Sequence, residues 1–301
     1  MPALFVTGAT GFVGRVFIER IATHDDVTVT ALARHVPSSP PAPSVRWVQG
    51  DLLGDGDWRS ALEGADTVVH MAAATGRIAP AQIRRVNVDA TARLLEFARA
   101  ANVGRFLFVS SIAANFADAP HYHYAAAKRE AERAVLGSGL RTLIVRPTMV
   151  LGTGSPIGQK LRALATAPVM AVFGNGRTRI QPVHVGDLAA LLLALATGPA
   201  FDGRTLDAGG PGAVGIEEFL RKVRTAVRGA AGSVLHVPVR PLRSVLAAIE
   251  RVSVRIVPFT AGQLASFTND GTTSGPDAWR EAGTEPLHDI DSIAAETAAD
   301  A

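Results

Sequence analysis

Residues 7–14 of the chain are Thr7-Gly8-Ala9-Thr10-Gly11-Phe12-Val13-Gly14, with three glycines at intervals of three residues. The apolar run just before them predicts a buried strand, and the residues just after them have the periodicity of a helix. The glycines therefore stand where a strand passes into a helix, which is the context of a pyrophosphate-binding turn. Gly8 allows the tight turn, Gly11 lets the backbone approach the phosphates, and Gly14 lets the helix pack closely on the strand.

This stretch predicts a dinucleotide site, because the unpaired N–H groups that begin the helix would face an anion. The alternative is an ordinary glycine-rich turn between a strand and a helix. The predicted cofactor contacts in the turn are Gly8, Thr10, Gly11, Phe12, Val13 and Gly14.

Strands and helices alternate beyond the turn. We expect further strands at residues 27–33, 45–49, 67–70, 105–110 and 142–145. We expect helices between them at residues 13–22, 58–62, 81–101 and 124–136. This alternation is typical of an α/β fold with a doubly wound parallel sheet, the Rossmann arrangement.

The regular alternation ends near Pro147. We expect a dinucleotide-binding domain over residues 1–150, to which residues 177–200 return. Residues 151–176 and 201–301 would then form a smaller, mainly helical substrate lid. Helices are expected at residues 186–197, in the returning segment, and at residues 216–228 and 242–252, in the lid. The apolar segment 242–257 is a candidate lining for the substrate pocket.

Composition excludes several classes of protein. The 301 residues are 48% hydrophobic and 19% charged, which is typical of a globular chain. The absence of cysteine excludes disulfides, thiolate catalysis and cysteine metal sites. A formal charge of only +3 gives no reason to expect a nucleic-acid partner.

We expect a cytoplasmic protein with a small-molecule substrate, as a monomer or homodimer. The N-terminus lacks the basic region and cleavage site of a signal peptide. The most apolar segment, residues 188–196, is too short to span a bilayer, which leaves only peripheral membrane contact open.

The choice of cofactor depends on the end of the second strand. A carboxylate there would bind the 2′-hydroxyl of NAD, but the sequence has Arg34, which suits the 2′-phosphate of NADP. We therefore expect NADP(H) rather than NAD(H), the alternative being a solvated arginine. After the third strand, Asp51 can accept a hydrogen bond from the adenine amino group, with Leu52 beside it, although a plain loop aspartate would look the same. After the fourth strand, Ala72 completes this part of the predicted site.

The second informative pattern is Tyr124-Ala125-Ala126-Ala127-Lys128, in a chain with only two tyrosines. On a helix the tyrosine and lysine lie one turn apart on the same face, so the ammonium would lower the pKa of the phenol from about 10. Tyr124 is the predicted acid/base, and Ser111, at the end of the fifth strand, would hold the substrate oxygen. Tyr122 is the rival phenol, but no lysine follows it at that spacing.

Other polar residues are assigned no catalytic role. His121 and His123 lack a third ligand at a useful spacing, so no metal site is predicted. Glu130 and Glu132 flank arginines on the same helix and predict a solvated face.

These motifs resemble those of the short-chain dehydrogenase/reductases, in particular the extended or atypical branch known as the NAD-dependent epimerase/dehydratase family. The glycine turn, the segment from Asn87 to Glu96, the Tyr124–Lys128 pair and Arg146-Pro147 carry the resemblance, together with Val183-His184-Val185-Gly186-Asp187. It implies that Lys128 also binds the nicotinamide ribose and that Pro147 lies along the nicotinamide. Asn87 is counted among the residues that bind the cofactor, and the resemblance implies that it also holds the active-site helix. For His184 and Asp187 it implies a role in positioning a helix.

Within that branch the chain is similar to bacterial relatives of the NADPH-binding accessory subunit of respiratory complex I. The similar stretches are residues 174–184, 207–211 and 258–264. This likeness implies an alternative in which NADPH is bound for assembly or redox sensing without catalysis. Only 12 residues separate Ser111 from Tyr124, a shorter loop than the family's sugar-nucleotide enzymes usually carry.

The sequence therefore predicts hydride transfer between a nicotinamide cofactor and a carbonyl or alcohol substrate. Tyr124 would exchange the proton, Ser111 would orient the oxygen, and Lys128 would lower the tyrosine pKa. An epimerase or dehydratase acting on a sugar-like substrate would use the same groups and stays open as an alternative, as does the non-catalytic NADPH-binding protein.

Overall fold

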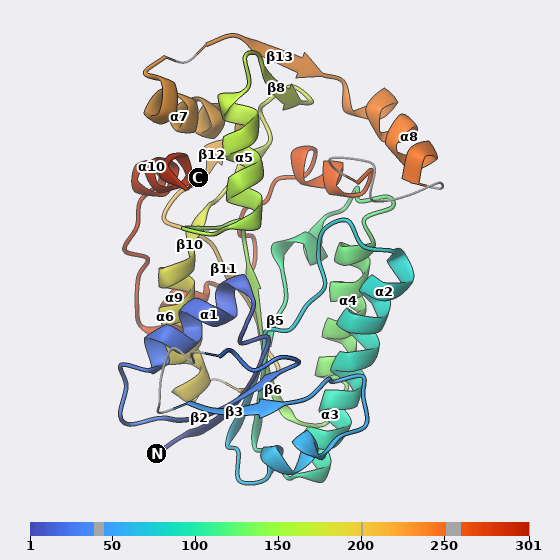
Figure 1. Cartoon of the computed structure of the whole chain (residues 1–301), viewed down its shortest axis with the longest axis vertical. Helices are drawn as coiled ribbons and strands as arrows, with labels where there is room; N and C mark the ends of the chain where they lie inside the picture. Colours follow the sequence, from blue (N-terminus) through green and yellow to red (C-terminus); the bar gives the residue numbers. More distant parts are fainter. Residues whose placement is uncertain (39–44, 200, 231, 251–259, 301) are drawn as a thin grey trace.

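A seven-stranded parallel sheet forms the centre of the computed structural model, which describes residues 1–38, 45–199, 201–230, 232–250 and 260–300 (Figure 1). The strand order is β11-β6-β5-β4-β1-β2-β3, and every neighbouring pair is parallel. The order reverses between β1 and β4, so the predicted doubly wound α/β fold is confirmed. The strands are β1 Ala3–Thr7, β2 Thr28–Ala33, β3 Val45–Gln49, β4 Thr67–His70, β5 Arg105–Val109, β6 Arg141–Pro147 and β11 Thr205–Ala208.

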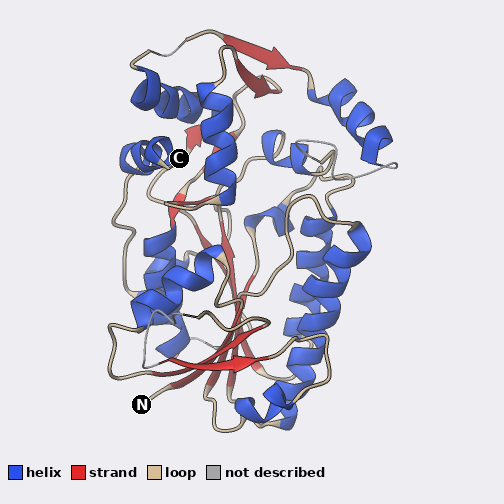
Figure 2. Ribbon diagram, viewed as in Figure 1, coloured by secondary structure: helices blue, strands red, loops and turns tan. Residues whose placement is uncertain are grey.

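Helices cover both faces of this sheet, as Figures 1 and 2 show. One face carries α1 Phe12–Ile21, α6 Val185–Thr197 and α9 Ala278–Ala282. The other carries α3 Ala90–Ala100, α4 His123–Leu136 and the 3-10 helix η1 Asp57–Leu62.

The two covered faces explain the apolar strands. Leu4 and Val6 of β1 pack into the core under α1 and α6, while Phe5 between them packs into the core under α3 and α4. Successive side chains of a strand point to opposite faces, so a strand buried on both sides must be apolar throughout.

The glycine turn joins β1 to α1 through two close backbone contacts. Gly8 has a φ of 77°, and a Cβ on it would lie 2.5 Å from the backbone nitrogen of Ala72. A Cβ on Gly14 would lie 2.1 Å from the carbonyl oxygen of Gly8. Only glycine at these two positions lets α1 start directly above the ends of β1 and β4.

The helix predicted for residues 81–101 is interrupted. It consists of α2 Pro80–Arg84, the π-helical turn η2 Arg85–Asp89, and α3. The π turn contains Asn87, whose buried side chain bonds to a neighbouring loop, and such turns are frequent at functional sites. The predicted helix 58–62 is the 3-10 helix η1.

A second apolar core lies beyond the carboxyl ends of the sheet. Its helices are α5 Pro156–Thr166, α7 Ile216–Arg228, α8 Val239–Glu250, η4 Gln263–Phe267 and α10 Ile290–Ala299. Three pairs of short strands accompany them: β7 Val150–Leu151 with β10 Val183–His184, β8 Met170–Phe173 with β13 Val234–Val237, and β9 Arg179–Ile180 with β12 Val214–Gly215. Residues 251–257, which complete the predicted lining segment 242–257, lie outside the described residues.

The sheet order corrects the division of residues between the two regions. Residues 201–301 were all assigned to the smaller region, but β11 is an edge strand of the central sheet and α9 packs beside it. The returning segment was expected to be residues 177–200, but β9 pairs with β12 and belongs to the second core. The error arose because isolated short strands such as β11 lack the alternation with helices that marks the first six.

None of the helices in the described part of the chain is both long enough and apolar enough to cross a membrane.

Replacing Gly14 by alanine should destabilise the protein even though alanine favours a helix by about 1 kcal/mol. The added Cβ would meet the Gly8 carbonyl oxygen at 2.1 Å, so the turn must shift, at a cost of about 1–3 kcal/mol. Chemical denaturation measures this loss. Gly54→Ala is the matched control because its Cβ would meet its nearest neighbours at 3.5 Å, an ordinary contact. Equal stability of the two variants would contradict the packing argument.

Candidate functional site

A cavity of about 1150 Å³ opens at the carboxyl ends of the central strands. The glycine turn and the residues that follow β2, β3, β4, β5 and β6 form its wall. The predicted site residues that line it are Gly8, Thr10, Gly11, Phe12, Val13, Gly14, Arg34, Asp51, Leu52, Ala72, Ser111, Tyr124, Lys128 and Pro147.

The start of α1 fits the pyrophosphate of a dinucleotide. The helix has no side-chain cap, and the residues of its first turn line the cavity. The Gly11 N–H donates to the Gly8 carbonyl oxygen at 2.9 Å, which closes the turn, and a Cβ on Gly11 would crowd that oxygen at 3.2 Å. An uncapped helix N-terminus with close backbone access suits a phosphate group.

Arg34 lies exposed at the end of β2 and lines the same cavity. Asp51 lines it after β3, with one carboxylate oxygen accepting the Leu53 N–H at 2.9 Å. Arg85, in the π turn, also lines it and was missed, because nothing in a helical run marks the residue that faces a cavity.

Asn87, predicted to bind the cofactor, does not line the cavity. It is buried, its side-chain oxygen accepts the Ala74 N–H at 2.8 Å, and its amide donates to the Ala74 carbonyl at 2.9 Å. Both polar groups of the side chain are thus engaged in holding the loop after β4. Ala72 and Ala74 of that loop line the cavity, so Asn87 shapes the cavity wall indirectly, by holding the loop in place.

Ser111, Tyr124 and Lys128 are brought together where β5 ends and α4 begins. The Tyr124 hydroxyl is hydrogen-bonded to Ser111, whose Oγ also accepts the Ala113 N–H at 3.2 Å. The Lys128 Nζ donates to the Val109 carbonyl at 2.8 Å and lies 6.0 Å from the centre of the Tyr124 ring. The helical spacing thus places the phenol and the ammonium on the same buried side, next to the serine.

The electrostatics of this group differ from the expectation. Loss of hydration raises the pKa of Tyr124 well above its ordinary value, the neighbouring Tyr122 raises it further, and only the hydrogen bond with Ser111 opposes the shift. Burial also lowers the pKa of Lys128 to about 7. The net shift of the tyrosine pKa is therefore upward and not downward as expected, because burial disfavours both charged forms. Tyr124 holds its proton at neutral pH.

Glu132 was expected on a solvated face but is buried beneath the site. Its carboxylate accepts two hydrogen bonds from Arg146, at 2.8 and 2.6 Å, and a third from Ser110 Oγ at 2.5 Å. Its negative charge also raises the pKa of Lys128 against the effect of burial. The signal in the sequence was its spacing, since Glu132 follows Lys128 by one helical turn and shares its face.

A second cavity, of about 470 Å³, meets the first at Ser111 and Tyr124, which line both. Its wall comes from segments far apart in the chain, including α5 and η4. A ligand here and a ligand in the larger cavity would therefore meet at the Ser111–Tyr124 pair.

The C-terminal segment fixes the turn before Tyr124. His121 has a φ of 61°, and a Cβ on Gly262 would lie 2.3 Å from the His121 carbonyl oxygen. The hydroxyl of Tyr122 is hydrogen-bonded to Ser266 of η4. Residues about 140 positions later thus help to place Tyr124.

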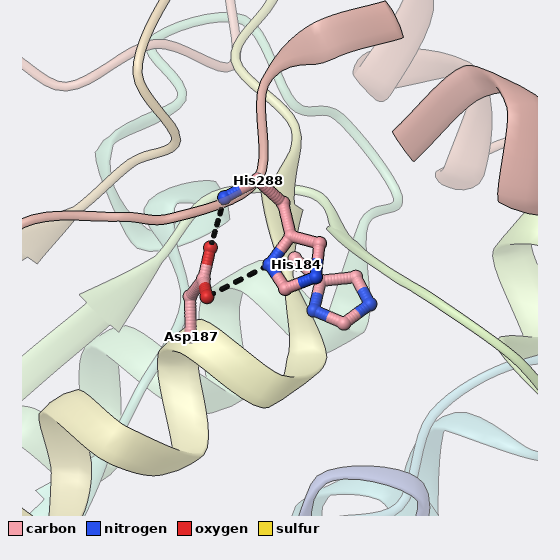
Figure 3. Close-up of side chains that lie close together, drawn as sticks. All are labelled: His184, Asp187 and His288. Atoms are coloured by element: carbon pink, nitrogen blue, oxygen red, sulfur yellow. Dashed lines mark hydrogen bonds and ion pairs between the residues drawn. The ribbon is translucent and has the colours of Figure 1, made fainter. Parts of the chain in front are cut away.

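His184, Asp187 and His288 form a separate cluster (Figure 3). The two imidazole rings stack with centroids 3.7 Å apart and an angle of 26° between their planes. Asp187 accepts His288 Nδ1 at 2.9 Å and the N–H groups of Leu287 and His288 at 3.0 Å.

The three side chains of this cluster are hydrogen-bonded within the protein, which is typical of a structural role. His184 accepts the Gly186 N–H at the start of α6, and its other ring nitrogen bonds to Glu296 of α10 at 2.8 Å. The nitrogen lone pairs of an imidazole lie in the plane of its ring. In two nearly parallel, stacked rings these lone pairs point side by side and do not converge on one metal ion. The cluster therefore ties the segment around α10 to the start of α6.

The model of the NAD dependent epimerase/dehydratase family matches residues 4–209. A ceramide reductase of Caulobacter vibrioides is 35% identical over 197 residues, which are 64% of this chain and 61% of the relative, so the chain spans less than two thirds of that protein.

A 4-hydroxy-2-methyl-3-oxo-4-farnesyl-3,4-dihydroquinoline-1-oxide ketoreductase of Stigmatella aurantiaca is 30% identical, and the match covers 80% of this chain and 77% of the relative. Among solved structures, MoeE5 in complex with UDP-glucuronic acid and NAD is similar with a TM-score of 0.74 and 22% identity, covering 99% of this chain and 98% of that one. At that identity the likeness concerns the fold alone.

The free energy of unfolding should rise as the pH increases from about 7 towards 10. The pKa of Lys128 is lowered to about 7 from an ordinary 10.5, so in this window the unfolded chain holds a proton that the folded chain has lost. Lys128→Met should flatten this rise. Lys222→Met is the control, because Lys222 is paired with Asp291 near the surface and its pKa is raised. Urea unfolding at several pH values measures the slopes, and an unchanged slope in Lys128→Met would contradict the assignment.

Proposed function

Because the chain belongs to the NAD-dependent epimerase/dehydratase family, we propose that it is an NAD(P)-dependent oxidoreductase that reduces the carbonyl group of a small molecule. The observation that carries the proposal is the Ser111–Tyr124 hydrogen bond at the junction of the two cavities. A cofactor in the larger cavity and a substrate in the smaller one would meet at the proton donor.

The bound dinucleotide would supply the hydride to the carbonyl carbon. Tyr124 donates its proton to the carbonyl oxygen, and Ser111 donates a hydrogen bond that orients this oxygen. Lys128, fixed by the Val109 carbonyl, lies on the side of the phenol where its charge would stabilise the phenolate left by proton transfer. With its raised pKa, Tyr124 carries its proton at neutral pH, and this is the proton that the product alcohol needs.

Two alternatives use the same fold. An epimerase would return the hydride to the opposite face of the substrate carbon, and the likeness to MoeE5 is compatible with it. The two relatives named as reductases favour net reduction, and ceramide and the farnesyl compound both carry long apolar chains. A non-catalytic NADPH-binding protein, the role suggested by the complex I likeness, would have no need for a serine, tyrosine and lysine in this arrangement.

For the cofactor we favour NADP(H). Arg34 at the end of β2 can form charge-assisted hydrogen bonds with a 2′-phosphate, and no carboxylate stands at this strand end to bind a ribose hydroxyl.

Tyr124→Phe should reduce turnover by about a hundredfold to ten-thousandfold, because it removes the proton donor and leaves the ring in place. Binding of NADPH should stay normal, since the glycine turn is untouched. Tyr122→Phe is the matched control: it removes the neighbouring phenol, which bonds to Ser266, and should cost far less. Steady-state rates of NADPH oxidation with a ketone measure both. Equal turnover by the wild type and by Tyr124→Phe would show that Tyr124 is not the proton donor.

Arg34→Ala should weaken NADPH binding by about tenfold to a hundredfold, the loss expected for hydrogen bonds to a charged group. Binding of NADH, which has no 2′-phosphate, should hardly change. Arg46→Ala, on the exposed side of β3 and away from the cavity, is the control. Titration followed by the fluorescence of the reduced nicotinamide gives the affinities. If Arg34→Ala lowered the affinities for NADPH and NADH equally, Arg34 would not be the residue that sets the cofactor preference.

A further inference from the structure

The smaller cavity has an apolar wall drawn from five segments of the chain. It includes Ile83 of α2, Phe116 between β5 and α4, Ile157 and Leu161 of α5, Ile180 of β9 and Phe267 of η4. Leu161, Ile180 and Phe267 belong to the second apolar core and Ile157 packs against it, so the cavity extends from Ser111 and Tyr124 into that core. A ligand that fills this space must present an apolar surface to it.

Many of the polar side chains on the wall are already bonded within the protein. Tyr122 is bonded to Ser266, and Thr148 Oγ1 donates to the Gln181 carbonyl. Ser155 Oγ donates to the Val150 carbonyl at 3.1 Å and accepts the Gly158 N–H at 3.2 Å.

The same holds where α8 ends beside the cavity. The Glu250 carboxylate accepts the Ala261 N–H, and Thr260 and Gln263 bond to each other at 2.9 and 3.1 Å. A substrate rich in hydroxyl groups would lose water here and find few partners, which is costly.

The wall is also poor in permanent positive charge. Lys160 is the only lysine or arginine among the described residues that line the smaller cavity. Burial and the charge of Arg77 both lower its pKa, which makes it a weaker partner for an anion. Burial also lowers the pKa of His123, so this imidazole is neutral at pH 7. A nucleoside diphosphate, which needs several cationic or N–H donors for its phosphates, does not match such a wall.

We propose that the substrate is a ketone with a long apolar chain, bound with its carbonyl at Ser111 and Tyr124 and its chain along Phe116, Ile157 and Leu161. This inference rests on the proposed function and adds the substrate class. The reaction breaks the carbonyl π bond, forms a C–H bond with the hydride and an O–H bond with the Tyr124 proton, and oxidises the reduced nicotinamide as the ketone becomes a secondary alcohol.

The test is a chain-length series. Ethyl esters of 3-oxoalkanoic acids, from the butanoate to the dodecanoate, are assayed with the purified protein and NADPH. Each methylene buried against the wall should raise kcat/KM by about fourfold until the cavity is full. Binding of the matching alcohols in the presence of NADP⁺, measured by calorimetry, should tighten in the same order.

Ile157→Trp provides the complementary variant. Ile157 is half-buried at the start of α5, so a larger ring there would shorten the cavity. The variant should lose the rise in kcat/KM with chain length that the wild type shows. Val245→Trp is the control, because Val245 is 55% exposed on α8 and does not line the cavity. Normal NADPH binding checks that each variant is folded.

The outcomes separate the two proposals. A rising series that Ile157→Trp truncates supports the apolar-chain substrate. Equal kcat/KM across the wild-type series would overturn it and leave carbonyl reduction standing. Turnover of a UDP-sugar in preference to every ester would overturn it and favour the epimerase in place of net reduction. No reduction of any ester or other ketone by a protein that binds NADPH would overturn the proposed function, and this inference with it.

Discussion

A single buried carboxylate, Glu132, joins α4 to the ends of β5 and β6 beside Ser111, Tyr124 and Lys128. It reaches from α4 to Ser110, just after β5, and to Arg146 near the end of β6. A charge in this position is tolerated because three hydrogen bonds, two of them from the bidentate arginine, replace its water. Since Ser111 follows Ser110, and Tyr124 and Lys128 are carried on the same helix, the distance between serine and tyrosine depends on this joint.

Burial, more than the pairing of charges, sets the chemistry of the site. It raises the pKa of Tyr124 and lowers that of Lys128, so both groups are pushed towards their neutral forms. Glu132 partly restores the positive charge of the lysine. A neutral phenol beside a lysine that can gain or lose its proton near pH 7 is suited to giving up a proton and tolerating the phenolate that remains.

The two cavities have different origins in the chain. The wall of the larger one consists mostly of loops at the ends of consecutive strands, in the order of the sequence. The smaller one is closed by α5 and η4, more than 90 residues apart, and the same C-terminal segment brings Gly262 against the His121 carbonyl. The wall of the smaller cavity and the turn before Tyr124 are therefore coupled through contacts between distant residues.

The sequence by itself determined the doubly wound sheet, and nearly all of the site residues that it predicted line the larger cavity. Glycine spacing, apolar strands and the Tyr124–Lys128 interval act over one or two turns of chain, so local geometry alone places these groups. The place of β11, the loop-holding role of Asn87, the burial of Glu132 and the pKa directions were decided by tertiary structure. Each depends on what packs against a residue from elsewhere in the chain, and the loss of water that results has no local signature in the sequence.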